Sequence, residues 1–243
     1  MPFKTKPNYS PNFNSQKRLK KQVRFIILHY TGMKSEKEEI IRLTNMQSQV
    51  ASHYLITRNG KIINLVPDLY IAWHAGISSW KTLNSLNKNS IGVEITNPGH
   101  QFGYKKFSKK QISSLINLSK FLIEKYKINK RNILGHSDIA PDRKKDPGEK
   151  FPWEYLAKKN ISIWHNLDKQ KLKKLRKKKC NEIMKNLFLN NLFSIGYAKK
   201  EKNNVKNDRY LVFVIKAFQR RFRPELINGK IDQECLLISQ NLT

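Results

Sequence analysis

Short apolar segments alternate with amphipathic segments between about residues 20 and 160, and this alternation constrains the fold more than any other feature of the chain. Residues 23–28 form a nearly continuous β-branched and apolar run, which is too short for a helix and is typical of a strand buried on both faces. Residues 53–57 and 61–66 are two more strand-like runs, and the Asn-Gly pair between them favours a tight hairpin turn. Residues 90–96 form a further predicted strand.

Two amphipathic segments separate these strands. Each begins with a Ser that is followed three positions later by Glu or Gln, which is the pattern of a capping box at a helix start. The predicted helices span residues 35–49 and 108–127, and a last short strand is predicted over residues 132–134. Strands with helices between them indicate an α/β domain with a mixed central β-sheet flanked by helices.

The character of the sequence changes after residue 160. Residues 169–179 contain eight basic side chains in eleven positions, and the segments that follow have a helical pattern without a convincing pair of strands. We therefore predict an irregular N-terminal arm, the α/β domain, a basic linker or helix, and a small all-α C-terminal domain. These four parts cover residues 1–22, 23–160, 161–180 and 181–243.

The chain is strongly basic, with 48 Lys and Arg against 18 Asp and Glu and a formal net charge of +30. Such a charge attracts nucleic acid, an anionic membrane or an acidic polymer. A high positive charge also arises without selection for an anionic ligand, because an AT-rich coding sequence enriches a protein in Lys and Asn. No helix-turn-helix, zinc finger or stacking-aromatic RNA motif is recognisable, so no specific nucleic-acid partner is predicted.

The two cysteines, Cys180 and Cys235, are far apart and predict neither a disulfide framework nor a cysteine metal site. The first residues are basic but lack the apolar run of an export signal, and no stretch of about 18 apolar residues suggests a membrane span. These features predict a cytoplasmic protein.

Two histidines and one aspartate occupy positions that suit a metal site. His29 and His136 each follow a strand-like run, where α/β sheets place functional groups, and Asp146 precedes a Pro-Gly turn that can direct its carboxylate back toward the sheet. Two imidazoles and one carboxylate form a catalytic zinc set with a fourth position for water. Spacing alone leaves open the alternative that His29 packs in the core and Asp146 only begins a turn.

Glu94 is the one acidic residue in the apolar strand predicted over residues 90–96. A carboxylate buried in such a strand is costly unless it is paired or has a function. The alternative is that Glu94 faces solvent while Ile91, Val93 and Ile95 occupy the opposite face of the strand.

Five ordered segments resemble the zinc-dependent N-acetylmuramoyl-L-alanine amidases of the type-2, peptidoglycan-recognition-protein family. The match covers roughly residues 23–156, and its most specific part runs from the Gly-His-Ser-Asp-Ile-Ala-Pro sequence to the Asp-Pro-Gly sequence. The five segments are residues 25–31, 52–56, 72–76, 90–94 and 135–148.

The resemblance assigns roles to eight residues of this chain. One Zn²⁺ per chain is expected on three ligands, which are His29, His136 and Asp146. Two residues are expected to act on the scissile bond: Glu94 as the general acid/base and Lys144 as the group that stabilises the developing oxyanion. Three more are expected along the substrate groove, namely His74, Asn97 and Arg143, although His74 could equally be a ring packed inside the fold.

The activity implied by this resemblance is hydrolysis of the amide bond between N-acetylmuramic acid, or its 1,6-anhydro form, and L-alanine of the peptidoglycan stem peptide. The expected partners are peptidoglycan or muropeptide fragments, in cell-wall turnover or recycling, and no oligomeric state is predicted. The alternative function is a non-catalytic peptidoglycan-recognition module, although such proteins typically lack a zinc ligand.

The C-terminal part has a resemblance of its own. Residues 214–224 and 228–232 are similar to the helical peptidoglycan-binding domain that follows some of these amidases, which implies a periplasmic or cell-wall location as the alternative to the cytoplasm. The alternative interpretation is a purely structural amphipathic helix, in which Val214, Phe218 and Phe222 lie in the core and the arginines form a solvated face.

Overall fold

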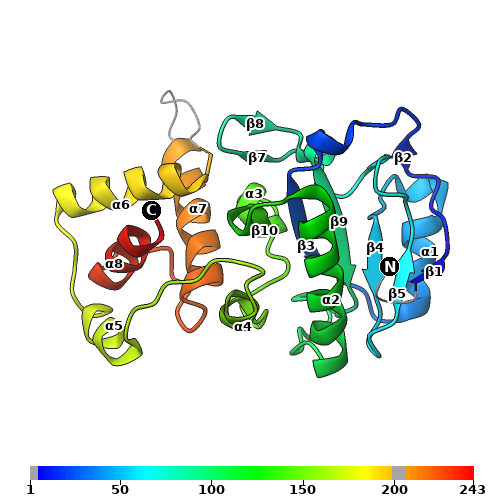
Figure 1. The fold of residues 1–243 in the computed structure, drawn as a ribbon. Helices are drawn as coiled ribbons and strands as arrows, with labels where there is room; N and C mark the ends of the chain where they lie inside the picture. Colours follow the sequence, from blue (N-terminus) through cyan, green and yellow to red (C-terminus); the bar gives the residue numbers. More distant parts are fainter. Residues whose placement is uncertain (1–4, 199–205) are drawn as a thin grey trace.

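The computed structural model describes residues 5–198 and 206–243, and its centre is a mixed six-stranded β-sheet (Figure 1). The strand order is β1-β5-β4-β9-β3-β10, and β4, β9, β3 and β10 are parallel to one another, whereas β5 is antiparallel to β4. This confirms the predicted fold class. The strands are β1 (Thr5–Pro7), β3 (Phe25–Tyr30), β4 (Tyr54–Ile56), β5 (Ile62–Asn64), β9 (Ser90–Ile95) and β10 (Ile133–Gly135).

Alternation along β3 divides the interior between the two faces of the sheet. Ile26 and Leu28 pack with helix α2 (Lys109–Tyr126), whereas Phe25 and Ile27 belong to a second cluster that includes residues of the C-terminal helices. Helix α1 (Glu36–Thr44) also packs against the face opposite α2, through Leu43. The functional groups described below lie on the face of the sheet opposite α2.

Local capping explains where the two predicted helices start. Ser108 Oγ accepts from the Gln111 N–H (3.1 Å) and Gln111 Oε1 accepts from the Ser108 N–H (2.9 Å), so the predicted capping box of α2 is formed. Helix α1 is shorter than predicted because Asn45 adopts an extended backbone and caps a separate 3₁₀ turn. The short 3₁₀ helices are Lys20–Gln22, Met46–Ser48, Leu86–Asn89 and Lys130–Asn132.

The predicted irregular N-terminal arm contains ordered strands. β1 pairs with β5 at the edge of the main sheet, and β2 (Phe13–Asn14) pairs with β6 (Ile71–Ala72) in a small antiparallel sheet. A second small sheet joins β7 (Ser79–Trp80) and β8 (Leu83–Asn84). The prediction missed β1 and β2 because backbone pairing to distant segments holds these polar, Pro-containing residues in place.

The C-terminal part is helical, as predicted, and its helices lie beyond the β10 edge of the sheet (Figure 1). They share one hydrophobic cluster with the α/β domain, in which Phe188, Phe218 and Phe222 join Phe25 and Leu134. Within residues 5–198 and 206–243, no helix is both long and apolar enough to cross a bilayer. The helices after the sheet are α3 (His136–Ile139), α4 (Trp153–Lys158), α5 (Lys169–Leu175), α6 (Glu182–Ile195), α7 (Lys206–Phe222) and α8 (Gln233–Leu242).

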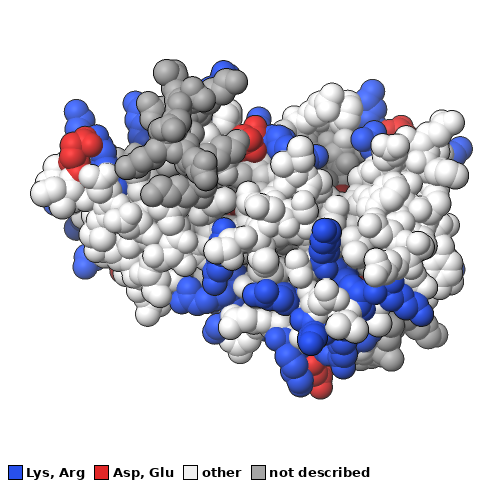
Figure 2. Space-filling model, turned by 90° about the horizontal axis from the view of Figure 1, so that it is seen from above, with Lys and Arg blue, Asp and Glu red and all other residues white. Residues whose placement is uncertain are grey.

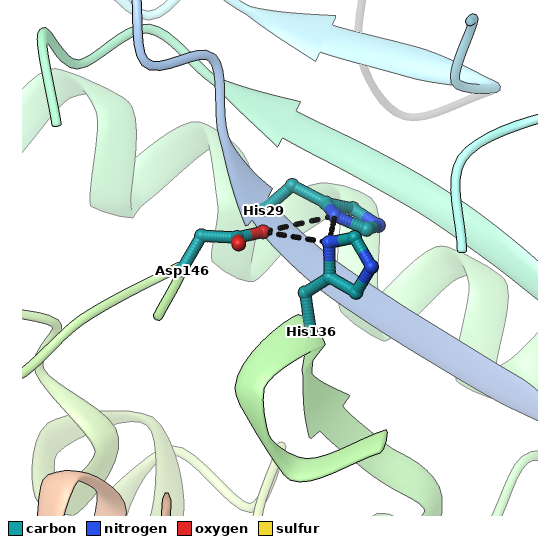
Figure 3. A group of neighbouring side chains, drawn as sticks. All are labelled: His29, His136 and Asp146. Carbon is teal, nitrogen blue, oxygen red and sulfur yellow. Dashed lines mark hydrogen bonds and ion pairs between the residues drawn. The ribbon is translucent and has the colours of Figure 1, made fainter. Parts of the chain in front are cut away.

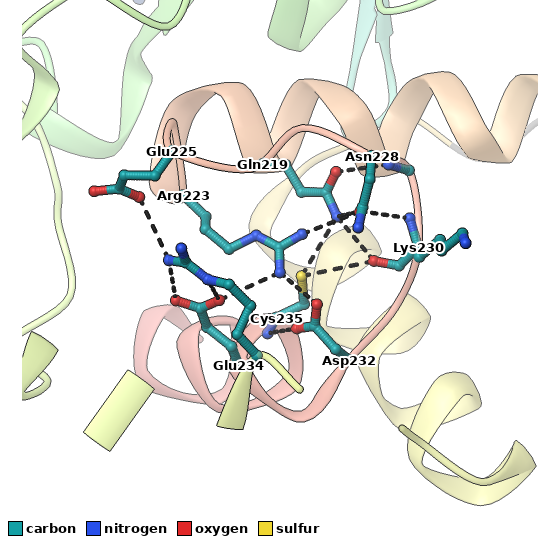
Figure 4. A network of polar contacts seen from close by, with 10 residues as sticks. Gln219, Arg223, Glu225, Asn228, Lys230, Asp232, Glu234 and Cys235 are labelled. Atoms are coloured by element: carbon teal, nitrogen blue, oxygen red, sulfur yellow. Dashed lines mark hydrogen bonds and ion pairs between the residues drawn. The ribbon is translucent and has the colours of Figure 1, made fainter. Parts of the chain in front are cut away.

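Arg220 and Arg221 near the end of α7 and Arg223 just after it are buried, so the interpretation that these arginines form a solvated face is wrong. Arg223 donates to the carboxylates of Asp232 and Glu234, and Glu234 also accepts from Arg176 Nε (2.5 Å) and Nη2 (2.8 Å), as Figure 4 shows. Gln219 Nε2 donates to the Lys230 carbonyl (2.8 Å) in the same network. These residues therefore connect α7, α8 and the loop between them.

Candidate metal centre and active site

Three side chains that are distant in sequence converge on the sheet face opposite α2 (Figure 3). His29 lies in β3, His136 begins α3 directly after β10, and Asp146 lies in the loop after α3. The His29 and His136 Nδ1 atoms are 2.9 Å apart, and Asp146 Oδ2 lies 3.1 Å from the first and 3.0 Å from the second. The structure thus brings together the three predicted metal ligands, and all three are buried.

The register of the parallel strands places Glu94 beside this cluster. Glu94 of β9 pairs with His29 of β3, and side chains of paired residues in neighbouring parallel strands lie on the same face. Gly135 pairs with Leu28, so His136 continues the same row one position later. Strand register therefore brings a carboxylate and two imidazoles into line at the ends of three strands.

The donor set fits a divalent metal ion. His136 Nε2 donates to the Ala75 carbonyl (3.1 Å), and a ring with its one hydrogen on Nε2 presents a lone pair at Nδ1, the atom beside Asp146 Oδ2. Ligand atoms at about 2.0–2.1 Å from a tetrahedral Zn²⁺ are roughly 3.3 Å apart, close to the separations found here. A backbone hydrogen bond from the Ser137 N–H to the Asp146 carbonyl (2.8 Å) holds the aspartate loop against α3.

The buried environment shifts the pKa values of the cluster apart. Burial and the neighbouring His136 lower the pKa of His29 to about 4, so its ring is neutral at pH 7. Burial opposes ionisation of Asp146, but His136 and His29 outweigh it and hold the pKa of this carboxyl far below its usual value. A neutral His29 ring beside an ionised Asp146 carboxylate is the protonation state in which these two groups bind a metal.

Glu94 has the properties of a functional carboxylate. It is 8% exposed, so the alternative of a solvent-facing Glu94 is wrong. Burial, followed by the charge of Asp146, raises its pKa well above 4.5. Its Oε2 atom has no hydrogen-bond partner among the described residues, which leaves that oxygen free for a ligand in the pocket.

A pocket of about 620 Å³ opens over the cluster. Lys144 and Arg143 line it together with Arg42. Arg143 is anchored, because Nη2 donates to the carbonyls of Ala75 (2.5 Å) and Ile77 (2.5 Å). The pocket thus combines the candidate metal ligands with these basic residues and with the acidic residues Glu38 and Glu39.

The three predicted substrate-groove residues have different environments. His74 is buried at the pocket and contacts His29, and Arg143 lies on the pocket wall; for both, substrate contact stays a prediction. Asn97 is fully buried, donates to the Lys105 carbonyl (2.8 Å) and accepts from the Gly99 N–H (3.1 Å). The structure thus shows that the Asn97 side chain holds its own loop, and its contact with substrate stays a prediction.

Sequence reasoning missed Glu39, a buried residue of α1 that lines the same pocket. Its carboxylate accepts from the hydroxyls of Thr31 (2.6 Å) and Thr96 (2.5 Å), which lie just after β3 and β9. Glu39 thus ties together the strand ends that carry His29 and Glu94. Its position one turn before the buried Leu43, on the inner face of a helix, is the signal that could have found it.

Comparison with known proteins agrees with this geometry. Residues 19–149 match the family described as N-acetylmuramoyl-L-alanine amidase. The chain is 36% identical over 233 residues to N-acetylmuramoyl-L-alanine amidase AmiD of Escherichia coli, an alignment that covers 91% of this chain and 82% of AmiD. It is 40% identical over 101 residues to 1,6-anhydro-N-acetylmuramyl-L-alanine amidase AmpD of Haemophilus influenzae, covering 41% of this chain and 53% of AmpD.

Two solved structures resemble the whole chain. E. coli AmiD, in complex with the substrate anhydro-N-acetylmuramic acid-L-Ala-D-gamma-Glu-L-Lys, superposes with a TM-score of 0.78 at 35% identity and covers 91% of this chain and 88% of its own. AmpDH3 of Pseudomonas aeruginosa superposes with a TM-score of 0.79 at 31% identity and covers 96% of this chain and 95% of its own. The similarity therefore includes the C-terminal helices.

Proposed function

The chain belongs to the N-acetylmuramoyl-L-alanine amidase family, and on this premise we propose that its metal cluster, Glu94 and Lys144 together perform the amidase reaction. The enzyme hydrolyses the amide bond between N-acetylmuramic acid, or its 1,6-anhydro form, and L-alanine of the stem peptide. The observation that carries the assignment of residues is the buried trio of His29, His136 and Asp146 with Glu94 in register beside it.

Zn²⁺ held by His29, His136 and Asp146 would lower the pKa of a bound water toward about 7 and polarise the scissile carbonyl. Glu94 lines the same pocket and has an oxygen without a partner among the described residues, and we assign it the proton transfers. It takes a proton from the attacking water and delivers it to the alanine nitrogen, so that the amine leaves neutral. Its raised pKa suits a group that must both accept and return a proton near neutral pH.

Lys144 supplies positive charge on the pocket wall, two residues before Asp146. Its ammonium group is placed to stabilise the negative oxygen that develops on the carbonyl during attack. Because His29, His136 and Asp146 at the pocket floor are buried, a fixed positive charge acts more strongly on that oxygen than it would in solution. We therefore assign Lys144 to oxyanion stabilisation.

The surface charge is consistent with an anionic substrate. Figure 2 shows Lys and Arg side chains gathered toward one edge of the face in view, at the bottom of the picture, with few Asp and Glu among them. The stem peptide carries carboxylates, so long-range attraction toward the basic surface would raise the association rate and would weaken as salt is added. This gives the net charge a role in substrate capture without a nucleic-acid partner.

The test is to incubate the purified full chain with anhydro-muropeptide and, separately, with intact sacculi, with and without a chelator, and to identify the products by mass spectrometry. We expect free stem peptide and a sugar fragment with a free lactyl carboxylate, and no product in the chelator. Glu94→Gln should be inactive, whereas Glu154→Gln, a carboxylate of α4 paired with surface lysines, should match the wild type. An intact muramoyl–alanine amide in the wild-type reaction, or full activity of Glu94→Gln, contradicts the assignment.

The choice of substrate also distinguishes the two predicted locations. Cleavage of fragments alone favours recycling in the cytoplasm, and release of stem peptides from sacculi favours the periplasmic or cell-wall alternative. We propose that the C-terminal helices contribute to binding of the glycan in the second case, and a sacculus pull-down of the full chain measures this directly.

A further inference from the structure

A chain of buried hydrogen bonds runs from His29 through His74 to the backbone of the 3₁₀ helix Leu86–Asn89. His29 Nε2 lies 3.0 Å from His74 Nδ1, and His74 Nε2 lies 3.1 Å from Ser90 Oγ. Ser90 Oγ lies 2.7 Å from the Leu86 carbonyl oxygen. His29, His74, Ser90 and Leu86 are all buried, so bulk water does not compete for these contacts.

The direction of each bond follows from the far end of this chain. Two oxygens 2.7 Å apart need a hydrogen between them, and a carbonyl has none, so the Ser90 hydroxyl donates to Leu86. Its only hydrogen is then used, and Ser90 Oγ must accept from His74 Nε2–H. A neutral imidazole has one N–H, so His74 Nδ1 is an acceptor and the hydrogen in its contact with His29 belongs to His29 Nε2.

The hydrogen-bond chain fixes the tautomer of His29, one of the three candidate metal ligands. With its hydrogen on Nε2, the neutral His29 ring presents a lone pair at Nδ1, the atom that lies beside His136 Nδ1 and Asp146 Oδ2. The opposite tautomer would place a hydrogen between these three atoms. His136 reaches the same state by a separate route, through its Nε2–H bond to the Ala75 carbonyl.

The fold builds a slot for the His74 ring. A Cβ atom at Gly92 would lie 2.4 Å from His74 Cγ, so only glycine leaves room for the ring against β9. His53 also packs edge-on against His74 with ring centroids 5.6 Å apart, and His53 Nδ1 accepts from the Gly92 N–H (3.0 Å). The ring is thus held in position independently of any substrate.

We propose that His74 is a positioning residue, which together with Ser90 fixes the tautomer and orientation of His29 and so prepares Nδ1 to bind the metal. This assigns His74 a role different from the substrate contact predicted from the sequence. The inference rests on the proposed metal site, but it concerns the protonation of the metal-free protein as well as its affinity for Zn²⁺. Such outer partners of metal-binding histidines typically change metal affinity by about 10–100-fold when removed.

The first experiment reads the tautomers directly. A long-range ¹H–¹⁵N correlation spectrum of the histidine-labelled, metal-free full chain should show His29 and His74 as Nε2–H tautomers. In Ser90→Ala, His74 loses its acceptor, and we expect a fraction of His74 to become the Nδ1–H tautomer. A wild-type spectrum with the hydrogen on His29 Nδ1 or His74 Nδ1 overturns the proposal, and it does so without any variant having to fold.

The second experiment measures Zn²⁺ affinity by competition with a chromogenic chelator. We expect His74→Leu to bind Zn²⁺ about 10–100-fold more weakly than the wild type, and His74→Asn, whose amide oxygen can take the place of Nδ1 as acceptor, to recover most of this loss. Ser90→Ala should lose about threefold to tenfold. Ser119→Ala is the matched control, because Ser119 is an equally buried serine whose hydroxyl has no partner among the described residues.

The two proposals fail in different ways. Wild-type affinity in His74→Leu, or no difference between His74→Leu and His74→Asn, overturns the role of His74 while leaving the metal site intact. Absence of Zn²⁺ binding by the wild type overturns the proposed metal. The spectrum of the metal-free protein still shows whether His29 and His74 are the Nε2–H tautomers that the hydrogen-bond chain requires.

Discussion

Arg221 of α7 connects the C-terminal helices to α3, the short helix that begins with His136, and its replacement tests whether these helices support the catalytic domain. Arg221 is 3% exposed and Nη1 donates to Asp138 Oδ2 (2.6 Å), while Nη2 donates to the Ile133 carbonyl (3.0 Å). Asp138 is 1% exposed and also accepts from the Tyr197 hydroxyl (2.8 Å). It lies two residues after His136, so the ion pair joins α7 to the metal-binding segment.

Replacement of Arg221 by Met keeps the apolar stem of the side chain and leaves the Asp138 carboxylate buried without its cation. Removal of one partner of a buried ion pair typically costs about 3–5 kcal/mol. For a chain of this length, each kcal/mol lowers the melting temperature by about 2–4 °C, so we expect a fall of roughly 6–20 °C. Arg220→Met is the control, because Arg220 Nε has no partner among the described residues, and its loss should stay below about 1.5 kcal/mol.

The assay is urea unfolding of the full chain at a fixed Zn²⁺ concentration, with Arg221→Met, Asp138→Asn and the double variant compared. Each single variant leaves one buried charge without its oppositely charged partner, whereas the double variant removes both charges. The double variant should therefore lose less stability than the sum of the single variants, by at least about 1 kcal/mol. Additive losses, or an Arg221→Met variant as stable as Arg220→Met, would refute the reasoning.

Three other predictions follow from the site and the core. Lys144→Met should lower kcat by about 10²–10³ with an unchanged zinc content by elemental analysis, and a zinc-free variant would contradict its role at the oxyanion. Because the pKa of Glu94 is raised well above 4.5, kcat/KM should fall as the pH drops through that raised pKa, and an unchanged pH profile in a residually active Glu94→Asp variant would argue against this assignment. Burial opposes ionisation of Asp68, but hydrogen bonds from Lys125, Tyr54 and Tyr126 outweigh burial and lower the pKa of this carboxyl below 3.8. The ionised Asp68 therefore stabilises the fold above pH 3.8, and this contribution is lost as the pH falls through the lowered pKa. The difference in urea midpoint between wild type and Asp68→Asn should accordingly shrink on acidification, and a constant difference would speak against it.

Local signals in the sequence predicted the elements that carry the site. The apolar runs of β3 and β9 and the capping box of α2 are encoded by neighbouring residues, so they could be identified without the structure. The positions of His29 and His136 after strand-like runs also predicted that they would meet. The distance between His29 and His136 and the alignment of Glu94 with His29 both depend on strand register, which no local pattern specifies.

The remaining features depend on partners far away in the sequence. Arg221 resembles a surface residue on a helical wheel, and only its contact with Asp138, 83 residues earlier, explains its burial. Asn97 follows a functional strand, but its bonds to Lys105 and Gly99 are set by the shape of one loop. His74 was predicted in the groove, whereas its hydrogen bonds to His29 and Ser90 became visible only once the sheet was assembled.

The most direct test of the proposed chemistry is to follow the source of the oxygen in the product. The wild-type protein is loaded with Zn²⁺ and allowed to cleave anhydro-muropeptide in ¹⁸O-labelled water, and the fragments are analysed by mass spectrometry. We expect one heavy oxygen in the lactyl carboxylate of the sugar fragment, none in the stem peptide, and no labelled product from Glu94→Gln. Label in the peptide or at the sugar anomeric carbon, or equal labelling by Glu94→Gln, would contradict amide hydrolysis by water at this site.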